Sequence, residues 1–244
     1  MAFFVAPEFD YDGEMTLDTR ERLLVAFPHR VPRPERTFIL DSGAFAVSKQ
    51  KTRWPEPQYI SRLAAWYAEH YRPGMLCIAP DVYPDGRATM QRYRRYRERF
   101  SVPLVPVVQG DDWFDSRRQI RFYAPFRPEA IALSNPGRRY DEYAPLLAWQ
   151  IECVRRYHGD IHIHSLGAGW TPEEAGQYRS FHGLGSFDTI AYYTQAREVE
   201  GWAGNRHWQA APEPSRCPCA ACRAGLADWR YIAMHNAAVY QSVH

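Results

Sequence analysis

The chain has 244 residues, of which 45% are hydrophobic and 24% are charged, and this composition excludes a disordered chain. The length suits one α/β barrel, and we expect a single structural domain. The net charge of +2 is too small to establish a polyanionic partner, although only Lys49 and Lys51 are lysines and all other basic residues are arginines. Arginine suits phosphate binding, and a genome rich in G and C gives the same bias.

No apolar run approaches the length of a membrane span, and residues 1–7 lack a basic leader. We therefore expect no membrane partner and a cytoplasmic location, which is the host cytoplasm if a phage encodes the protein. Thiols used for metal rather than for disulfides agree with that compartment.

Short apolar runs alternate with helical patterns along most of the chain, which is typical of parallel βα units. The predicted strands cover residues 3–6, 37–40, 75–79, 104–108, 130–133, 161–163 and 187–191. The predicted helices cover residues 17–26, 57–71, 88–100, 113–123, 142–157, 172–181 and 226–243. This alternation predicts a (β/α)8 barrel of the TIM type over residues 1–210, with residues 211–244 packed on it as a tail.

In such a barrel the catalytic side chains lie at the carboxyl ends of the strands, so the candidates are the residues that follow each apolar run. Carboxylates, an amide and a glycine-rich loop occur there. In chain order they are Asp41, Ser42, Phe45, Asp81, Gln109, Leu166, Gly167, Ala168, Gly169 and Asp188. Any one polar residue at such a place is equally well explained as the N-cap of the next helix. Their convergence on one mouth indicates a site.

A separate cluster near the carboxyl terminus has the pattern of a metal site. Cys217, Cys219 and Cys222 lie close together, and His235 follows thirteen residues after the last of them. Three thiolates and one imidazole match the ligands of a closed, tetrahedral zinc site. Because the protein fills all four positions, the zinc is expected to be structural and to hold the tail helix on the barrel.

In order, these motifs resemble the queuine and archaeosine tRNA-guanine transglycosylase family, and most closely its DNA-acting relatives, the 7-deazaguanine DNA transglycosylases. The resemblance extends from Asp41 to Tyr240. The first motif departs from the family's pattern at Ala44 and Ala46, where the family has glycine and glutamine. The motifs are Asp41-Ser42-Gly43-Ala44-Phe45, Val108-Gln109-Gly110, Ser165-Leu166-Gly167-Ala168-Gly169, Phe187-Asp188, the three cysteines and His235-Asn236.

The resemblance implies a base exchange in which guanine leaves a nucleic acid and a 7-cyano- or 7-aminomethyl-type 7-deazaguanine takes its place. Asp188 would be the nucleophile that forms a covalent glycosyl intermediate, and Asp41 the general acid/base. Structural Zn²⁺ is the implied cofactor. The implied substrate-binding residues are Asp81, Gln109, Phe45, Ser42, Leu166, Gly167, Ala168 and Gly169.

DNA is favoured over tRNA because the chain is shorter than the bacterial tRNA enzymes and has Tyr192-Tyr193-Thr194-Gln195 where they carry Pro-Thr-Arg. The alternative is a tRNA-guanine transglycosylase. An enzyme that extrudes a base needs a rim that holds phosphates. The candidates for this rim are Arg92, Arg94, Arg95, Tyr193 and Arg197, although a solvated helix face explains the arginines equally well. A homodimer is also permitted.

Two rival functions remain open at the level of the sequence. His162 and His164 point to the same face of a strand, as in metal-dependent barrel hydrolases, although they also suit a pocket lining or the barrel core. The second rival is a zinc-stabilised nucleic-acid-binding module without catalysis. Three carboxylates near phosphate argue against a pure binder, because like charges repel.

Overall fold

The computed structural model describes residues 2–5, 23–29, 31, 37–44, 54–136, 140–167 and 183–189. The strands are β1 Ala2–Val5, β2 Leu23–Ala26, β3 Thr37–Asp41, β4 Leu76–Ile78, β5 Leu104–Val105, β6 Val107–Val108, β7 Ala130–Ser134, β8 His162–Leu166 and β9 Ser186–Thr189. The α-helices are α2 Glu56–His70, α3 Gly86–Tyr96, α4 Trp113–Tyr123 and α5 Tyr140–His158, and short 3-10 turns follow α3 and α4.

The strands form one sheet in the order β5-β4-β3-β2-β1-β9-β8-β7-β6, and all neighbouring strands are parallel. The two outermost strands of this order belong to one segment, because only Pro106 separates β5 from β6. Proline has no backbone N–H and so interrupts the ladder there. The Pro106 carbonyl still accepts from the Ala132 N–H at 3.0 Å, so residues 104–108 pair with β4 on one side and β7 on the other. The predicted parallel α/β class is confirmed.

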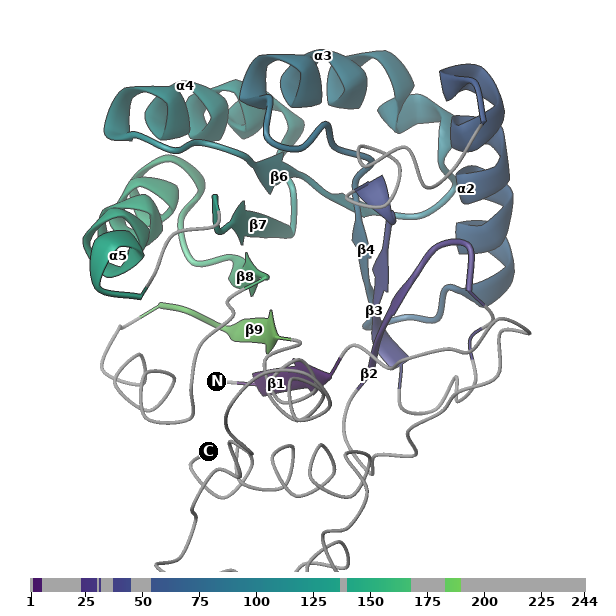
Figure 1. The fold of residues 1–244 in the computed structure, drawn as a ribbon, viewed down its shortest axis with the longest axis horizontal. Helices are drawn as coiled ribbons and strands as arrows, with labels where there is room; N and C mark the ends of the chain where they lie inside the picture. Colours follow the sequence, from purple (N-terminus) through teal and green to yellow (C-terminus); the bar gives the residue numbers. More distant parts are fainter. Residues whose placement is uncertain are drawn as a thin grey trace, which may run out of the picture.

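Helices α2 to α5 succeed one another along the outer side of the strands (Figure 1). Each covers the sheet with an apolar stripe. In α2 the buried residues recur every three or four positions, namely Tyr59, Ile60, Leu63, Trp66 and Tyr67. Complete burial of one such aliphatic side chain contributes about 2 kcal/mol. Packing of these stripes therefore holds the strand ends, and the residues on them, in place.

The starts of two helices follow from their capping residues. Asp85 accepts from the Ala88 N–H at 2.9 Å to begin α3, and Asp112 accepts from the Asp115 N–H at 2.7 Å to begin α4. Each bond satisfies an amide that has no partner within the helix. Asp112 lies only three residues after Gln109, so α4 begins beside the end of β6.

The predicted helices agree with α2, α4 and α5 to within two residues at each end, and residues 97–99 of the third form a 3-10 turn instead. The predicted helix over residues 17–26 is wrong over Leu23–Ala26, which is strand β2 between β1 and β3. Leu24 and Val25 are buried, and a parallel strand that is covered on both faces reads as a continuous apolar run. Such a short run carries too little periodicity to separate strand from helix.

The predicted helices over residues 172–181 and 226–243 lie outside the described residues, as does the predicted tail over residues 211–244. Within the described part of the chain, none of the helices has both the length and the hydropathy that a bilayer crossing requires.

Candidate active site

The structure brings the three predicted carboxylates to one edge of the sheet. Asp41 is the last residue of β3, Asp81 lies three residues after β4, and Asp188 lies in β9. All these strands are parallel, so their carboxyl ends meet at the same edge. The negative charges of Asp81 and Asp188 both raise the pKa of the Asp41 carboxyl.

Asp188 is buried, with 7% of its surface exposed, and its carboxylate is held from two sides. His164 Nε2 lies 2.9 Å from Oδ1, and the backbone N–H of Gly167 donates to Oδ1 at 3.2 Å and to Oδ2 at 3.3 Å. Gly167 has a φ of +61°, a conformation that glycine adopts without steric cost. The glycine after β8 therefore serves the carboxylate directly, which the sequence had not predicted.

Ser186 extends this arrangement on the far side of the imidazole. Its Oγ lies 2.8 Å from His164 Nδ1 and 2.7 Å from His162 Nε2. His164 and Ser186 are direct cross-strand partners of β8 and β9, and both are fully buried. The four side chains thus form a continuous chain in the order His162, Ser186, His164 and Asp188.

The chemistry of the groups sets the direction of these bonds. An ionised Asp188 only accepts, so His164 donates from Nε2 and its Nδ1 accepts the hydroxyl proton of Ser186. Ser186 Oγ then accepts from His162 Nε2. Burial, followed by the neighbouring His164 and Arg155, lowers the pKa of His162, which favours its neutral form. His162 therefore serves as a neutral hydrogen-bonding group.

Asp81 is the centre of a second group of polar side chains. Ser42 donates its hydroxyl to Oδ1 at 3.3 Å, and the Gln109 amide donates from Nε2 to Oδ2. Burial raises the pKa of Asp81 to about 6, and these hydrogen bonds together with the charge of Arg92 partly offset that rise. Each carboxylate oxygen keeps a further lone pair that can accept from a ligand.

Arg92, one of the predicted rim residues, contacts this group. Its Nη1 donates to the backbone oxygen of Asp81 at 2.6 Å, and its Nε pairs with Glu56 at 3.3 Å. Only 15% of its side chain is exposed. The rotation of α3 turns this arginine toward the strand end and presents Arg94 and Arg95 to solvent, and the role of all three in holding phosphate stays a prediction.

Asp41 has the most strongly raised pKa of the described carboxyl groups, at about 7. Burial is the main cause, and the negative charges of Asp81 and Asp188 add to it. The Gly43 N–H donates to Oδ2 at 3.1 Å and partly offsets the rise. A group with this pKa is present in both protonation states near neutral pH, as a general acid/base requires.

The Asp41-Ser42-Gly43 turn admits only glycine at its third position. Gly43 has a φ of +67°, and a Cβ there would lie 2.3 Å from the backbone oxygen of Phe27. The turn is also held from α2, since the Tyr59 hydroxyl donates to the Ser42 carbonyl at 2.8 Å. The glycine of this motif is therefore required by packing.

Gln109 is fixed by a side chain of α4. Its N–H donates to Gln119 Oε1 at 2.9 Å, and Gln119 Nε2 donates in turn to Asp115 at 2.7 Å. A Cβ on Gly110 would lie 2.3 Å from Ser116 Oγ, so glycine allows the helix to approach. The Gln-Gly motif thus joins the end of β6 to α4.

The two histidines predicted as possible metal ligands make other contacts in the structure. His162 and His164 direct nitrogens at Ser186, and within the described ranges no group of three or more His, Cys, Asp or Glu side chains is arranged to hold a metal ion. The predicted residues that lie outside the described part of the chain are Phe45, Ala168, Gly169, Tyr193, Arg197, Cys217, Cys219, Cys222 and His235.

Sequence reasoning missed Ser186 and the bond between His164 and Asp188. The available signal was the pattern His-x-His on one strand beside Ser-x-Asp on the next. Alternate residues share a face of a strand, so the two pairs meet if the strands are neighbours in register. That register was not visible in the sequence.

Comparison with known proteins adds no relative to this description. No protein-family model matches the chain, and no curated protein matches it.

Proposed function

We propose that this protein is a transglycosylase that exchanges guanine in DNA for a 7-deazaguanine base through a covalent intermediate on Asp188. The observation that carries the proposal is the pairing of two unlike carboxyl groups at one edge of the sheet. Asp188 is held as an oriented acceptor by His164 and Gly167, while Asp41 has a pKa of about 7. A nucleophile and a proton carrier are the two groups that base exchange needs.

In the first half of the reaction, an Asp188 oxygen attacks C1′ of the target nucleotide. The bond between C1′ and the base nitrogen breaks, and its electron pair leaves with guanine. Protonated Asp41 supplies the proton that the departing base takes up. The products are a glycosyl ester on Asp188, neutral guanine and an ionised Asp41.

The second half reverses these roles with another base. Ionised Asp41 removes the proton from the ring nitrogen of the incoming 7-deazaguanine, and that nitrogen attacks C1′. The ester bond breaks and its electrons return to Asp188. The protein ends in its starting protonation state, so the exchange needs neither a redox partner nor a nucleotide cofactor.

The Asp81 group suits the recognition of the base. The guanine edge presents an N–H and an amino group side by side, which match a carboxylate acceptor. The second amide hydrogen of Gln109 suits the neighbouring carbonyl of the base. Because Ser42, Gln109 and Arg92 already fix Asp81, it is oriented before the base arrives. Preorganisation of this kind reduces the ordering cost of binding.

The fold that accompanies this function is the (β/α)8 barrel. It is supported by the strand order, since residues 104–108 pair with both β4 and β7 and so close the sheet on itself. With that segment taken as one strand, the sheet has eight. Cys217, Cys219, Cys222 and His235 would hold the proposed structural zinc, which would supply no step of the reaction.

The hydrolase alternative is less well supported by the site. A catalytic metal needs imidazole nitrogens that converge on an open position. Both His162 Nε2 and His164 Nδ1 are instead directed at the same serine hydroxyl, and His164 Nε2 at Asp188. The histidines are thus accounted for without a metal.

The proposal is tested by incubating the protein with a radiolabelled 7-deazaguanine and, separately, single-stranded DNA, duplex DNA and tRNA. We expect label in DNA with the wild type and none with Asp188→Ala. Label in tRNA alone would assign the activity to tRNA. Exchange by Asp188→Ala would exclude Asp188 as the nucleophile.

A further inference from the structure

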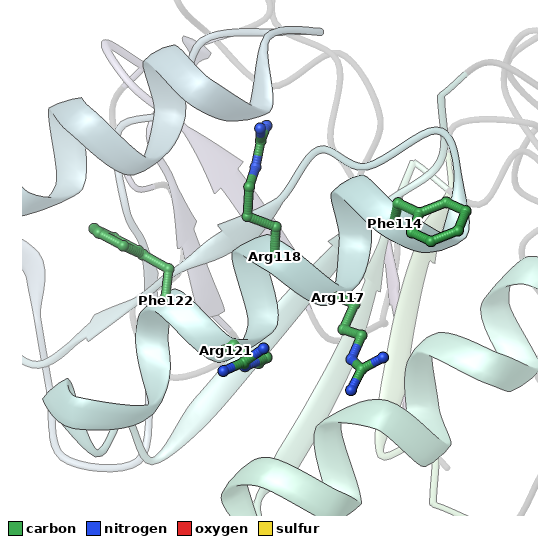
Figure 2. A pocket seen from close by; sticks show the side chains of 5 residues that line it. All are labelled: Phe114, Arg117, Arg118, Arg121 and Phe122. Atoms are coloured by element: carbon green, nitrogen blue, oxygen red, sulfur yellow. The ribbon is translucent and has the colours of Figure 1, made fainter.

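Three adjoining hollows lie on the outer surface of α3, α4 and α5, away from the carboxylates of the candidate active site. The central hollow lies along α4, and Figure 2 shows its five lining side chains on that helix. Arg118 also lines the hollow toward α3, and Arg117 also lines the one toward α5. The three hollows therefore form one continuous surface, which we call the arginine surface.

The charge of the arginine surface is strongly one-sided. Among the described residues that line it, six are arginines and one, Glu152, is acidic. Of the six, only Arg118 forms an ion pair within the described part of the chain, with Asp115. The arginines are Arg87, Arg94, Arg117, Arg118, Arg121 and Arg156. A surface with this balance attracts a polyanion.

Aromatic side chains accompany the arginines. Phe114 is 88% exposed and Trp113 is 47% exposed, and both lie in the first turn of α4. Exposed aromatic rings next to a basic groove are typical of proteins that stack unpaired bases while they hold the backbone. An acidic protein partner would use the charges but would not need these exposed rings at one end.

The arginine surface begins near the strand end that carries Gln109 of the candidate active site. Phe114, Arg117, Arg118, Arg121 and Phe122 recur at three- and four-residue spacing, so they form one stripe along α4. The stripe begins five residues after Gln109, whose N–H is bound by Gln119 of the same helix. It therefore leads from the strand end that carries Gln109 outward along the helix.

We propose that the arginine surface binds the sugar-phosphate backbone of the DNA strand that leads away from the target base, with Phe114 at the end nearest the site. This inference rests on the proposed function for its choice of DNA. Arg117 and Arg121 are its central residues. Both are preordered against Tyr157, through a 3.2 Å bond from Arg117 to its hydroxyl and the stacking of Arg121 on its ring.

The test compares the double variant Arg117→Ala/Arg121→Ala with Arg62→Ala. Arg62 is a matched control, because it is exposed and lies over the Trp54 ring as Arg121 lies over Tyr157, but it belongs to α2. Equilibrium binding of a single-stranded oligonucleotide that contains guanine is measured over a range of salt concentrations. The logarithm of the association constant falls as the logarithm of the salt concentration rises. Each lost phosphate contact is expected to make this slope less steep by about 0.7.

We expect the double variant to bind the oligonucleotide about tenfold more weakly at low salt, with a shallower slope, while its exchange rate at saturating DNA stays that of the wild type. Arg62→Ala should match the wild type. A second double variant, Arg94→Ala/Arg118→Ala, guards against a local folding defect and should behave in the same way. An unchanged slope in both double variants overturns the proposal.

The outcomes separate this proposal from the proposed function. If the double variants show a shallower slope but the wild type exchanges no base, the proposed DNA-binding surface stands and the proposed transglycosylase activity is excluded. If exchange depends on Asp188 but the slopes of the double variants are unchanged, the proposed activity stands and the proposed DNA-binding surface is excluded. A slope change with tRNA but none with DNA would overturn the assignment of the surface to DNA.

Discussion

His164 and Asp188 are joined by a buried hydrogen bond of 2.9 Å between Nε2 and Oδ1. The bond links neighbouring parallel strands, and Ser186 holds the opposite nitrogen of the same ring at 2.8 Å. Since Nδ1 is occupied by a hydroxyl, the ring presents an N–H to the carboxylate. His164 is therefore a positioning residue for the proposed nucleophile.

Substitution of His164 tests this role. A glutamine places an amide N–H near the position of Nε2, whereas leucine removes the donor and keeps the bulk. We expect His164→Leu to slow formation of the covalent protein–DNA complex by about 100-fold, because a misplaced nucleophile loses its alignment with C1′. His164→Gln should recover much of that loss. The measurement is the single-turnover rate of complex formation, followed on a denaturing gel.

A structural role alone predicts a different result. If His164 only fills space, leucine should be tolerated better than glutamine, and the KM for DNA should change along with kcat. We expect kcat to fall with little change in KM. Equal rates for the two variants would contradict the positioning role.

The pKa of Asp41, raised to about 7, predicts opposite pH dependences for the two halves of the reaction. Departure of guanine needs protonated Asp41, so complex formation should slow about tenfold per pH unit above pH 7. Attack by the incoming base needs the ionised form, so decay of the complex should slow below pH 7. Stopped-mixing measurements of each half at pH 5.5 to 8.5 check this, and parallel profiles would contradict the assignment of both proton transfers to Asp41.

The charge of Asp81 contributes to the raised pKa of Asp41, after burial. Asp81→Asn removes that charge and keeps an oxygen that can accept from Ser42. The midpoint of the pH profile for complex formation should therefore move to lower pH, and base affinity should fall as well. An unmoved midpoint would show that the two carboxyl groups do not interact in solution.

Asp41 should also affect stability, with a sign that follows from its pKa. The pKa is raised from 3.8 to about 7 in the folded protein. The contribution of Asp41 to stability is thus fully present below pH 3.8 and is lost as the pH rises through 7. Asp41→Asn, which keeps an acceptor for the Gly43 N–H, should stabilise the fold at pH 8 by roughly 2 to 4 kcal/mol. Urea denaturation at several pH values checks this, and the gain should vanish near pH 4.

Gly43→Ala is predicted to destabilise the fold through two separate effects. Its positive φ is expected to cost about 1 kcal/mol, and the clash of the new Cβ with the Phe27 oxygen about 2 kcal/mol more. Gly159 has a similar φ of +73° but nothing within 4 Å of its added Cβ, so Gly159→Ala isolates the first effect. Urea denaturation of both variants measures the difference. Equal losses would show that the turn relaxes around the methyl group.

Removal of the proposed zinc should lower stability first. Cys219→Ser and treatment with a chelator are each expected to lower the melting temperature and to release one equivalent of zinc. Activity should fall only to the extent that the protein unfolds, because no step of the exchange involves that metal. Loss of activity at full stability would contradict the structural assignment.

Several features could be predicted from the sequence because they are local. These features are the helical spacing of apolar residues in α2 and α4, the apolar runs of the strands and the polar residues at the strand ends. Each can be recognised from residues that lie close together in the sequence. They placed Asp81 after a strand correctly, and Asp41, predicted to follow a strand, is the last residue of β3. The short run at Leu23–Ala26 was misassigned because four residues cannot reveal which neighbours will cover them.

The sequence by itself determined the alternation of strands and helices and the carboxyl groups at the strand ends, since spacing along one chain carries that information. Only the tertiary structure decided what those groups contact. The register of β8 against β9 places His164 beside Ser186 and Asp188, and the packing of α3 turns Arg92 toward Asp81. Hydrogen bonds between residues far apart in sequence depend on register and helix rotation, which arise only when the strands and helices pack together.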